Sequence, residues 1–361
     1  MKALPVILAL LLYLGGNFYV FFRLWQHIPC HAPLFRYAFI AGALLLATSM
    51  ILSFIFSGIL PAPLAGLLYA IGSTWIFVFL YLLLATLARD LLHWLDFLPL
   101  RGRALYYTLT GLAVVVLLAG HVCYLVKQRV EFTVDTGKLR GREYTLVLVS
   151  DLHLGHAIGN RELDRWVDLI NAEHPDAILI AGDVIDNDVR PLDESRAHER
   201  LLRLRAPLGV YACLGNHEYI AGVDRSLRFL SRAGIHVLRD AVIEIDSAFY
   251  LLGRDDRQNR HRSPLSSLAS ALDPSKPLIL LDHQPAHLDE AVASSVDLQL
   301  SGHTHEGQVW PISLLTRYLF ELSHGHLHRP PTHFYVTSGI GLWGGKFRVA
   351  TRSEYVIIHL R

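Results

Sequence analysis

Long stretches without charged residues dominate the first third of the chain. Residues 3–22 and 104–126 contain no Asp, Glu, Lys or Arg, and another such stretch runs from residue 37 to residue 88. About 20 apolar residues cross the hydrocarbon layer of a bilayer, so the stretch at 37–88 is long enough for two spans. The segment "SGILPAP" (57–63) places glycine and proline breakers near its middle. The sequence therefore predicts a membrane domain of four spanning helices in residues 1–126.

Two other interpretations of these stretches are less consistent with the sequence. A cleaved signal peptide also begins with a basic residue, here Lys2, but its apolar core is usually only about 7 to 15 residues long. Residues 3–22 exceed that length, and further spans follow. A transporter or channel usually needs ionisable residues inside its spans, and within the uncharged stretches only His121 qualifies. We therefore expect a multi-pass anchor in the cell membrane.

The composition changes abruptly after Val126. Four of the 20 histidines precede Gly141 and the other sixteen follow it, together with most of the charge. We expect the polar segment 127–142 to be a linker and residues 143–361 to form a domain large enough to bury its own core. The net charge of +1 argues against a nucleic-acid partner.

Short apolar runs alternate with helix-length amphipathic segments at the start of this domain. The run "YTLVLVS" (144–150) is followed by "RELDRWVDLINAEH" (161–174) and then by "DAILIAG" (176–182). This alternation is typical of βαβ units and predicts an α/β domain with a mostly parallel sheet. Later runs such as "PLILLDH" (277–283) and "EYVIIHL" (354–360) have fewer helices between them. They predict additional antiparallel strands, which could form a second sheet.

Polar side chains follow five of the expected strands. Open α/β sheets bind ligands at the carboxyl ends of their strands, so we expect these side chains to converge. Carboxylates, imidazoles and an amide without thiolates suit Mn²⁺, Fe²⁺, Zn²⁺ or Mg²⁺, and this set is too large for one ion. The candidate ligands are Asp151, His153, Asp183, Asn216, His283, His303 and His305.

A pair of metal ions about 3.5 to 4 Å apart meets the chemical demand of phosphate-ester hydrolysis. Such a pair lowers the pKa of a bridging water and binds both the attacking and the leaving oxygen. The spacing of Asp151 and His153 places both side chains on one side of an extended segment, because alternate side chains share a face. His303 and His305 repeat this spacing, so each imidazole can bind a different ion.

These motifs, in this order, resemble the calcineurin-like metallophosphoesterase superfamily. The segments "SDLHLGH", "LLDHQPAHLDEA" and "YVTSGIG" are similar to its membrane-anchored bacterial branch. The resemblance covers most of residues 145–308 and implies a four-layer αββα sandwich of two sheets with flanking helices. The matching motifs are "DLH" (151–153), "GDVID" (182–186), "GNHE" (215–218), "DHQP" (282–285) and "GHTH" (302–305).

The resemblance also implies a role for each site residue. One ion would be bound by Asp151, His153, Asp183 and His305, and the other by Asp183, Asn216, His283 and His303. Asp183 would then bridge the two ions. His217 matches the family histidine that supports the reacting phosphoryl group or protonates the leaving oxygen, a role that suits an imidazole.

The leading hypothesis is a membrane-anchored phosphohydrolase that uses two divalent metal ions. It would cleave a phosphoester or pyrophosphate bond by a metal-activated hydroxide, and a lipid-linked substrate in contact with membrane lipid would fit the anchor. One alternative is a catalytically silent membrane sensor or scaffold, which the complete set of candidate ligands disfavours. Another is a phosphatase acting on a soluble nucleotide or phosphoprotein, which would not require an anchor.

The side of the membrane that carries the catalytic domain depends on the basic residues near the spans. Four spans place the amino terminus and the catalytic domain on the same side. Five basic residues lie near the membrane on each side: Arg23, Arg36, Arg89, Arg101 and Arg103 against Lys2, Lys127, Arg129, Lys138 and Arg140. The loop between the second and third spans has none and lies on the catalytic side, which favours an extracytoplasmic domain under the positive-inside rule.

Two features lie beside the motifs. Similar proteins usually carry a small residue where this chain has Glu306, and the alternation of Gln308 and Trp310 predicts that Glu306 faces solvent. The histidines of "SHGHLHRP" (323–330) have no carboxylate partner in their segment, so we expect a solvated loop there.

Overall fold

The structure is a computed structural model that describes residues 3–28, 32–56, 59–95 and 103–361. The chain divides into two compact units. One comprises residues 1–122 with 344–347, and the other comprises residues 123–343 with 348–361.

Four long helices make up the first unit, as the sequence predicted. Each is long and apolar enough to cross a membrane, by length and composition. Prolines stand near the start of the second and third helices, where the missing N–H leaves no hydrogen bond unmade. Residues 57 and 58 of the predicted breaker lie outside the described residues. The helices are α1 (Ala3–His27), α2 (Pro33–Phe56), α3 (Ala62–Trp94) and α4 (Arg103–Leu125).

Polar contacts connect α1 to α3. The indole N–H of Trp75 donates a 2.8 Å hydrogen bond to the side-chain oxygen of Asn17, and both side chains are buried. Toward the other end of α1, Arg23 forms an ion pair with Asp90. Helices α1 and α3 extend beyond the uncharged stretches of the sequence. Both charged residues lie in these extensions.

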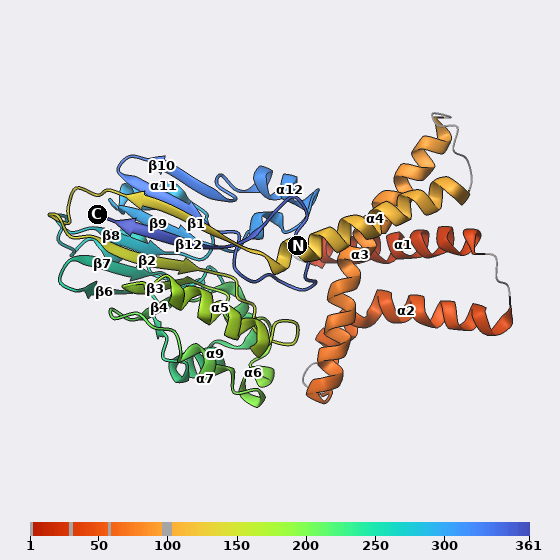
Figure 1. The fold of residues 1–361 in the computed structure, drawn as a ribbon, viewed down its shortest axis with the longest axis horizontal. Helices are drawn as coiled ribbons and strands as arrows, with labels where there is room; N and C mark the ends of the chain where they lie inside the picture. The colour runs from red at the N-terminus through yellow and green to blue at the C-terminus, as the bar shows by residue number, and fades with distance from the viewer. Residues whose placement is uncertain (1–2, 29–31, 57–58, 96–102) are drawn as a thin grey trace. The chain divides into compact units, whose positions relative to one another are not determined.

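Two six-stranded sheets form the second unit (Figure 1). The first sheet has the order β1 (Lys127–Val134), β12 (Ser353–Leu360), β2 (Tyr144–Val149), β3 (Ala177–Ala181), β4 (Val210–Cys213) and β5 (His236–Val237). The second has the order β10 (Gly325–Arg329), β11 (Thr332–Val336), β9 (Leu298–Ser301), β8 (Leu278–Leu281), β7 (Phe249–Gly253) and β6 (Ala241–Ile245).

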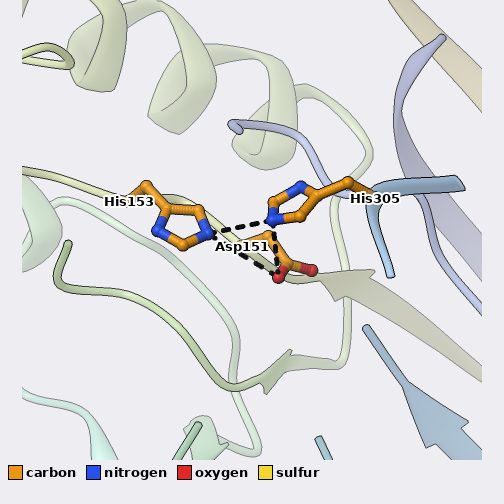
Figure 2. Close-up of side chains that lie close together, drawn as sticks. All are labelled: Asp151, His153 and His305. Atoms are coloured by element: carbon orange, nitrogen blue, oxygen red, sulfur yellow. Dashed lines mark hydrogen bonds and ion pairs between the residues drawn. The ribbon is translucent and has the colours of Figure 1, made fainter. Parts of the chain in front are cut away.

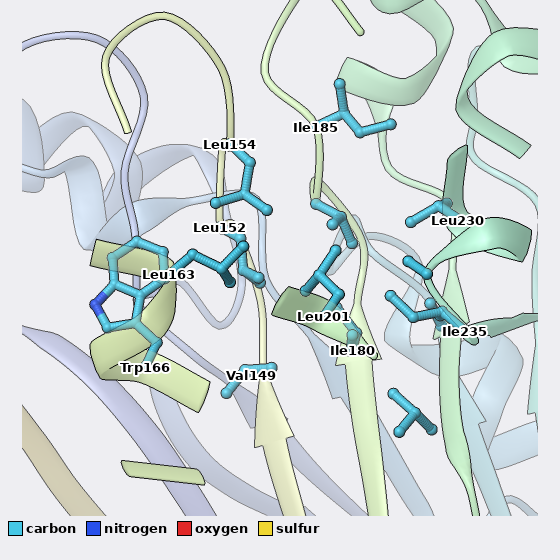
Figure 3. Close-up of a cluster of buried hydrophobic side chains, with 14 of the residues drawn as sticks. Val149, Leu152, Leu154, Leu163, Trp166, Ile180, Ile185, Leu201, Leu230 and Ile235 are labelled. Carbon is cyan, nitrogen blue, oxygen red and sulfur yellow. The ribbon is translucent and has the colours of Figure 1, made fainter. Parts of the chain in front are cut away.

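The side chains of β2 show why this strand is apolar at nearly every position. Val147 and Val149 pack outward against helices, in the cluster drawn in Figure 3. Leu146 and Leu148 point the other way, into the core between the two sheets. Successive residues of a strand face opposite sides, so a strand covered on both faces reads as a continuous apolar run.

Helices cover the outer faces of both sheets and complete four layers. On the first sheet, apolar residues of α5 (Asn160–Ala172), α7 (Ala197–Leu201) and α9 (Val223–Arg232) belong to the outer cluster. On the second sheet, apolar residues of α10 (Leu265–Ala269) and α11 (Leu288–Ala293) belong to a separate apolar cluster with residues of that sheet. The remaining elements are the helices α6 (Arg190–Glu194), α8 (Asn216–Ala221) and α12 (Ile312–Leu319) and the 3₁₀ turn η1 (His305–Gly307). The predicted αββα sandwich is therefore confirmed.

The strand arrangement differs from the prediction in two places. Strand β1 occupies the first half of the segment predicted as a linker and pairs with β12 in parallel. Charged residues alternate along it, as is common in edge strands, and they hide the strand pattern. In the second sheet the pairs β7–β8, β8–β9 and β9–β11 are parallel, and only the two edge pairs, β6–β7 and β10–β11, are antiparallel. The crossover helices α10 and α11 permit this, and they are too short to stand out in the sequence.

Candidate metal centre

The candidate ligands follow the carboxyl ends of five strands from both sheets. Three of these strands belong to the first sheet and two to the second, and the ligand atoms from both sheets lie together. β2 leads to Asp151 and His153, β3 to Asp183, β4 to Asn216, β8 to His283, and β9 to His303 and His305.

Left-handed backbone is concentrated at these residues. The φ angle is 55° at Asp151, 46° at His153, 53° at Asp183, 71° at His303 and 50° at His305. Non-glycine residues adopt such angles uncommonly, with Asp and His among those that do so more often. Strained backbone of this kind clusters at functional sites, where surrounding contacts maintain it.

Two glycines allow this close approach of backbone and side chains. A Cβ atom on Gly215 would lie 2.1 Å from Oδ1 of Asp183, and one on Gly302 would lie 2.4 Å from Oδ2 of Asp151. Real Cβ contacts are never this short, so both positions require glycine. The motifs "GNHE" and "GHTH" therefore begin with glycine for a steric reason.

One group of ligands consists of Asp151, His153 and His305, whose ligand atoms all lie within 4.8 Å of one another (Figure 2). The Nε2 atoms of the two imidazoles are 3.1 Å apart. Oδ1 of Asp151 lies 3.5 Å from Nε2 of His305 and 3.8 Å from Nε2 of His153. All three side chains converge on one point, although they come from different sheets.

A second group consists of Asp183, His283 and His303. Nε2 of His283 lies 3.1 Å from Oδ2 of Asp183, while its Nδ1 lies 2.7 Å from the carbonyl oxygen of Ala181. The carbonyl can only accept, so Nδ1 is the protonated nitrogen and Nε2 is free to bind a ligand. Asn216 opens α8, and the residues on both sides of it approach Asp183.

His217 lies between these groups. Its backbone N–H donates to Oδ1 of Asp183 at 2.9 Å, and its Nδ1 lies 2.7 Å from the carbonyl oxygen of Asp186. Its ring packs edge-on against that of His153, at 4.5 Å between centroids. The side chain is 13% exposed, more than the nearly inaccessible ring of His153, so His217 is the more open of the two toward solvent. His153, Asp183 and His217 also form a third group with metal-ligand spacing.

The electrostatics of the centre favour a positive charge. Burial lowers the pKa of His153, but the neighbouring carboxylates, Asp151 and Asp186 first among them, outweigh burial and raise it to about 10. Burial also opposes ionisation of Asp186, yet its hydrogen bonds to His153 and His217 hold its pKa at about 2. A cluster of ionised carboxylates in the interior therefore attracts cations.

The two histidines of "GHTH" stay neutral in the same surroundings. Burial is the largest cause that lowers the pKa of His303, to about 4. Burial likewise lowers the pKa of His305 to about 3, against the opposing charge of Asp151. Neutral imidazole is the form that binds metal ions.

Several buried atoms in the centre have no hydrogen-bond partner. They include Oδ1 of Asn216, Nε2 of His283 and Nδ1 of His305. Buried polar atoms are nearly always paired, and a role in binding an ion is one of the few explanations for an exception. Oxygen and imidazole nitrogen donors without thiolate suit borderline and hard divalent cations. The residues present therefore fit divalent metal ions.

Two carboxylates beside the ligands organise the loops. Oδ1 of Asp186 lies 3.5 Å from Nδ1 of His153 and 3.3 Å from Nδ1 of His217, so it is placed to orient both rings. Glu218 accepts hydrogen bonds from the backbone N–H groups of Asp183, Ile185 and Gly215. Burial, with the charge of Asp183, raises the pKa of Glu218 to about 7.

Arg348 is a buried residue of this centre that the sequence did not reveal. Its side chain is fully buried, and it donates to the carbonyl oxygens of His305, Ser338 and Gly341 at 2.6 to 3.0 Å. It stands 43 residues from His305 in the chain and belongs to no recognised motif. The sequence contained no signal that would have identified it.

Two expectations beside the motifs are wrong. The side chain of Glu306 is only 13% exposed and lies 3.4 Å from Arg317, because η1 replaces the extended chain on which its solvent-facing direction was based. His324 lies 3.1 Å from a carboxylate oxygen of Glu354, which is distant in sequence. The residues after it form strand β10, paired with β11, and not a solvated loop.

Comparisons with known proteins place this arrangement in a family. Residues 144–307 match the family described as calcineurin-like phosphoesterase. An uncharacterized metallophosphoesterase of Aquifex aeolicus is 34% identical over 243 residues, which is 64% of this chain and 92% of that protein. Another, from Helicobacter pylori strain J99, is 28% identical over 352 residues, 95% of this chain and 94% of that protein.

A vertebrate protein is similar over the same region. A Danio rerio protein named "Transmembrane protein with metallophosphoesterase domain" is 34% identical over 233 residues, 60% of this chain and 53% of that protein. The motifs, the two-sheet fold and the relative covered almost from end to end agree with one another. The chain belongs to the calcineurin-like metallophosphoesterase family.

Proposed function

We propose that the chain is a membrane-anchored phosphohydrolase with two divalent metal ions, which cleaves a phosphoester or pyrophosphate bond of a lipid-linked substrate. One observation carries the two-metal part. Oδ2 of Asp183 lies 3.7 Å from Nε2 of His153 and 3.1 Å from Nε2 of His283, and these two histidines belong to different ligand groups. A single carboxylate between two sets of ligands is suited to bridge two ions.

The proposed ligands divide between two positions. One position is held by Asp151, His153, Asp183 and His305, and the other by Asp183, Asn216, His283 and His303. When bound, the ion pair would supply an activated water nucleophile and Lewis acidity toward the phosphoryl oxygens. The protein keeps the ligands in place through the glycine contacts and the buried hydrogen bonds of Ser150 and Glu218.

His217 is proposed as the residue that protonates the leaving oxygen or stabilises the reacting phosphoryl group. Its Nδ1 lies 2.7 Å from the carbonyl oxygen of Asp186, which can only accept, so Nδ1 carries a proton. This contact leaves Nε2 as the nitrogen that can exchange a proton with substrate. Its greater exposure relative to His153 supports this role over that of a ligand.

Metal analysis tests the two-metal proposal. The full-length protein, purified in detergent and reloaded with Mn²⁺ or Zn²⁺, should hold close to two ions per chain by elemental analysis. Asp183→Asn should reduce both occupancies, because both positions use this carboxylate. Full activity with one ion per chain would contradict the proposal.

Four helices that could span a membrane support the anchor. The Danio rerio relative is named a transmembrane protein, which agrees with an anchor in this chain as well. We place the catalytic domain on the extracytoplasmic side because the loop between α2 and α3 has no basic residue. A reporter fused after Arg361 that is active only outside the cytoplasm supports this side, and one active only inside overturns it.

A lipid-linked substrate is the partner that makes an anchor useful. Tethering raises the effective concentration of the enzyme at the membrane surface. The full-length protein in nanodiscs should therefore hydrolyse a lipid pyrophosphate or phosphodiester in the same bilayer better than a soluble aryl phosphodiester at equal total concentration. Turnover of soluble nucleotides or phosphopeptides without turnover of the lipid substrates would overturn the substrate class and leave the two-metal chemistry intact.

A further inference from the structure

Exposed apolar side chains are concentrated in one short segment of the catalytic unit. From residue 127 to residue 361, the exposed large apolar residues are Leu202, Ile220, Trp310, Ile312, Leu314, Leu315, Tyr318 and Leu319. All but the first two lie within ten consecutive residues. A soluble surface usually scatters such residues singly, and a concentration of them marks an interaction site.

Helix α12 presents most of these residues on its solvent side. Leu314, Leu315, Tyr318 and Leu319 are 53%, 55%, 87% and 63% exposed. Their spacing of one and four residues places them along one face of a helix. The side chain that α12 buries is that of Ser313, a small polar residue. The helix therefore turns its polar residue inward and its apolar residues outward, the reverse of an ordinary surface helix.

The same helix packs against residues of the metal centre at both of its ends. The backbone of Ser313 packs on Gly307, where a Cβ atom would approach Cα of Ser313 to 2.5 Å. Gly307 is two residues after His305 and ends η1. At the other end of α12, the ring of Phe320 lies 6.0 Å from that of His303. The exposed apolar face therefore belongs to a helix that contacts the turn after His305 at one end and the ring of His303 at the other.

We propose that α12 and Trp310 dock on the lipid bilayer, with the apolar face in the interfacial layer and the metal centre beside it. This inference rests on the proposed membrane anchor. The catalytic unit follows the fourth candidate span directly, since α4 ends at Leu125 and β1 begins at Lys127. A bilayer is therefore the apolar surface that this domain meets at high effective concentration.

The composition of the segment matches a bilayer interface. Tryptophan and tyrosine are enriched where lipid headgroups meet acyl chains, and here Trp310 precedes the exposed leucines while Tyr318 lies among them. Arg317 lies on the same helix and is exposed, as expected for a residue at the level of lipid phosphates. Docking of this kind would place the metal centre at the depth of a lipid phosphate.

A second copy of the chain fits this surface less well. α12 has eight residues and is only about 12 Å long. A stable protein interface buries about 800 Å² on each partner, which a helix of this length does not supply alone. A bilayer has no such minimum, because the anchor already holds the domain at its surface.

Depth-dependent fluorescence quenching tests the docking. The full-length protein, with Cys30→Ser, Cys123→Ser and Cys213→Ala, carries one new cysteine labelled with bimane. It is placed in nanodiscs that contain brominated phosphatidylcholine, which quenches a label in contact with acyl chains. The labelled variants are Tyr318→Cys on α12, Val115→Cys on the exposed side of α4, and Leu202→Cys as an exposed apolar control. Unchanged thermal unfolding confirms that each variant is folded.

Quenching at residues 115 and 318 but not at 202 supports the proposal. Quenching at 115 alone overturns the docking of α12 and leaves the anchor intact. No quenching at 115 refutes the membrane anchor itself, and the proposal falls with it. Equal quenching at all three positions also overturns the proposal, because the lipid would then contact the domain without selecting α12.

Turnover gives a second, independent measurement. The double variant Leu314→Glu, Leu315→Glu should hydrolyse a soluble aryl phosphodiester at the wild-type rate, since both side chains are exposed on the solvent side of α12 and neither is a candidate ligand. Its KM for a lipid-linked phosphodiester in nanodiscs should rise roughly tenfold or more, as for the loss of a buried leucine. Leu202→Glu, the matched control, should change neither value. An unchanged KM for the lipid substrate overturns the proposal.

Discussion

Nη1 of Arg348 donates a 2.7 Å hydrogen bond to the backbone carbonyl of His305, while its Nη2 donates to carbonyl oxygens of the turn that lies against Asp151. In that turn, a Cβ atom on Gly341 would lie 2.5 Å from the carbonyl oxygen of Asp151. One buried guanidinium therefore holds the backbone on both sides of the first ligand group. Burial lowers its pKa to about 10, which still leaves it charged at neutral pH.

Arg348→Lys should weaken metal binding without touching a ligand. A lysine ammonium cannot reproduce the planar arrangement of donors, so several buried carbonyls would lose their partners. Each loss costs about 1 to 3 kcal/mol of folding free energy, and the losses are not additive. We expect a lower unfolding temperature and lower metal occupancy by elemental analysis. Arg352→Lys, at an exposed arginine that contacts Gln128, is the control and should change neither. A metal occupancy equal to that of the wild type in Arg348→Lys would show that the ligand loops keep their conformation without the guanidinium.

Gly302→Ala should disrupt the first ligand group. The new methyl would lie 1.9 Å from the hydroxyl oxygen of Ser150 and 2.4 Å from Oδ2 of Asp151, and neither atom can move away without breaking a buried contact. We expect turnover to fall by at least about 100-fold, because moving a catalytic group by about 1 Å from its reactive position has an effect of this size. Gly159→Ala is the control, since a Cβ there meets nothing within 4 Å. Equal activities of the two variants would refute the steric argument.

The sequence predicted the elements whose signal is local. β2 and β3 are apolar on both faces and stood out as runs, and the four long helices stood out as uncharged stretches. Edge strand β1 was missed because its exposed face carries charges, and the parallel order of the second sheet was missed because its crossover helices are short. These properties depend on pairing partners distant in the chain, which no local pattern reports.

The same distinction applies to the site. The candidate ligands follow strand ends and share recognisable spacing, so their convergence could be expected from the sequence. Arg348 and Glu354 act through partners tens of residues away, and only the fold shows those partners. Glu306 was misjudged because a strand alternation was extended into a 3₁₀ turn.

Removal of bound metal should destabilise the catalytic domain. The candidate ligands come together only in the folded chain, so ions that bind them stabilise the folded state over the unfolded one. Chelation should lower the unfolding temperature by roughly 10 °C, as for the loss of a tightly bound ligand from a domain of this size. Differential scanning calorimetry with chelator, and then with added Mn²⁺ or Zn²⁺, measures this effect. In Asp183→Asn the chelator should have little effect, and a large remaining shift would place the ions elsewhere.

The contact between His324 and Glu354 should make stability depend on pH. Burial lowers the pKa of His324, but the hydrogen bond to Glu354 outweighs burial and raises it above the ordinary value. A raised folded-state pKa stabilises the fold fully below the unfolded value of about 6.5, and this contribution is lost as the pH rises through the folded value. His324→Gln should therefore destabilise the protein more at pH 6 than at pH 9 in chemical unfolding. With Glu354→Gln already present, the difference should shrink to the smaller part that Glu306 contributes, whose carboxylate lies 3.9 Å from Nδ1 of His324. A difference that grows with pH would reverse the assignment.

His217→Ala should separate catalysis from metal binding. The imidazole of His217 contacts Asp186 through Nδ1. Its proposed role is to protonate the leaving oxygen, or to stabilise the reacting phosphoryl group, through Nε2. We expect kcat on an aryl phosphodiester to fall by about 10² to 10⁴, the usual effect of losing a general acid, with both ions retained. Asp183→Asn should instead lower occupancy and turnover together, because its carboxylate reaches both ligand groups. A substrate with a nitrophenolate leaving group needs little protonation, so it should recover part of the lost rate in His217→Ala. If His217→Ala instead loses one ion, His217 is a ligand, as the third group of side chains also permits.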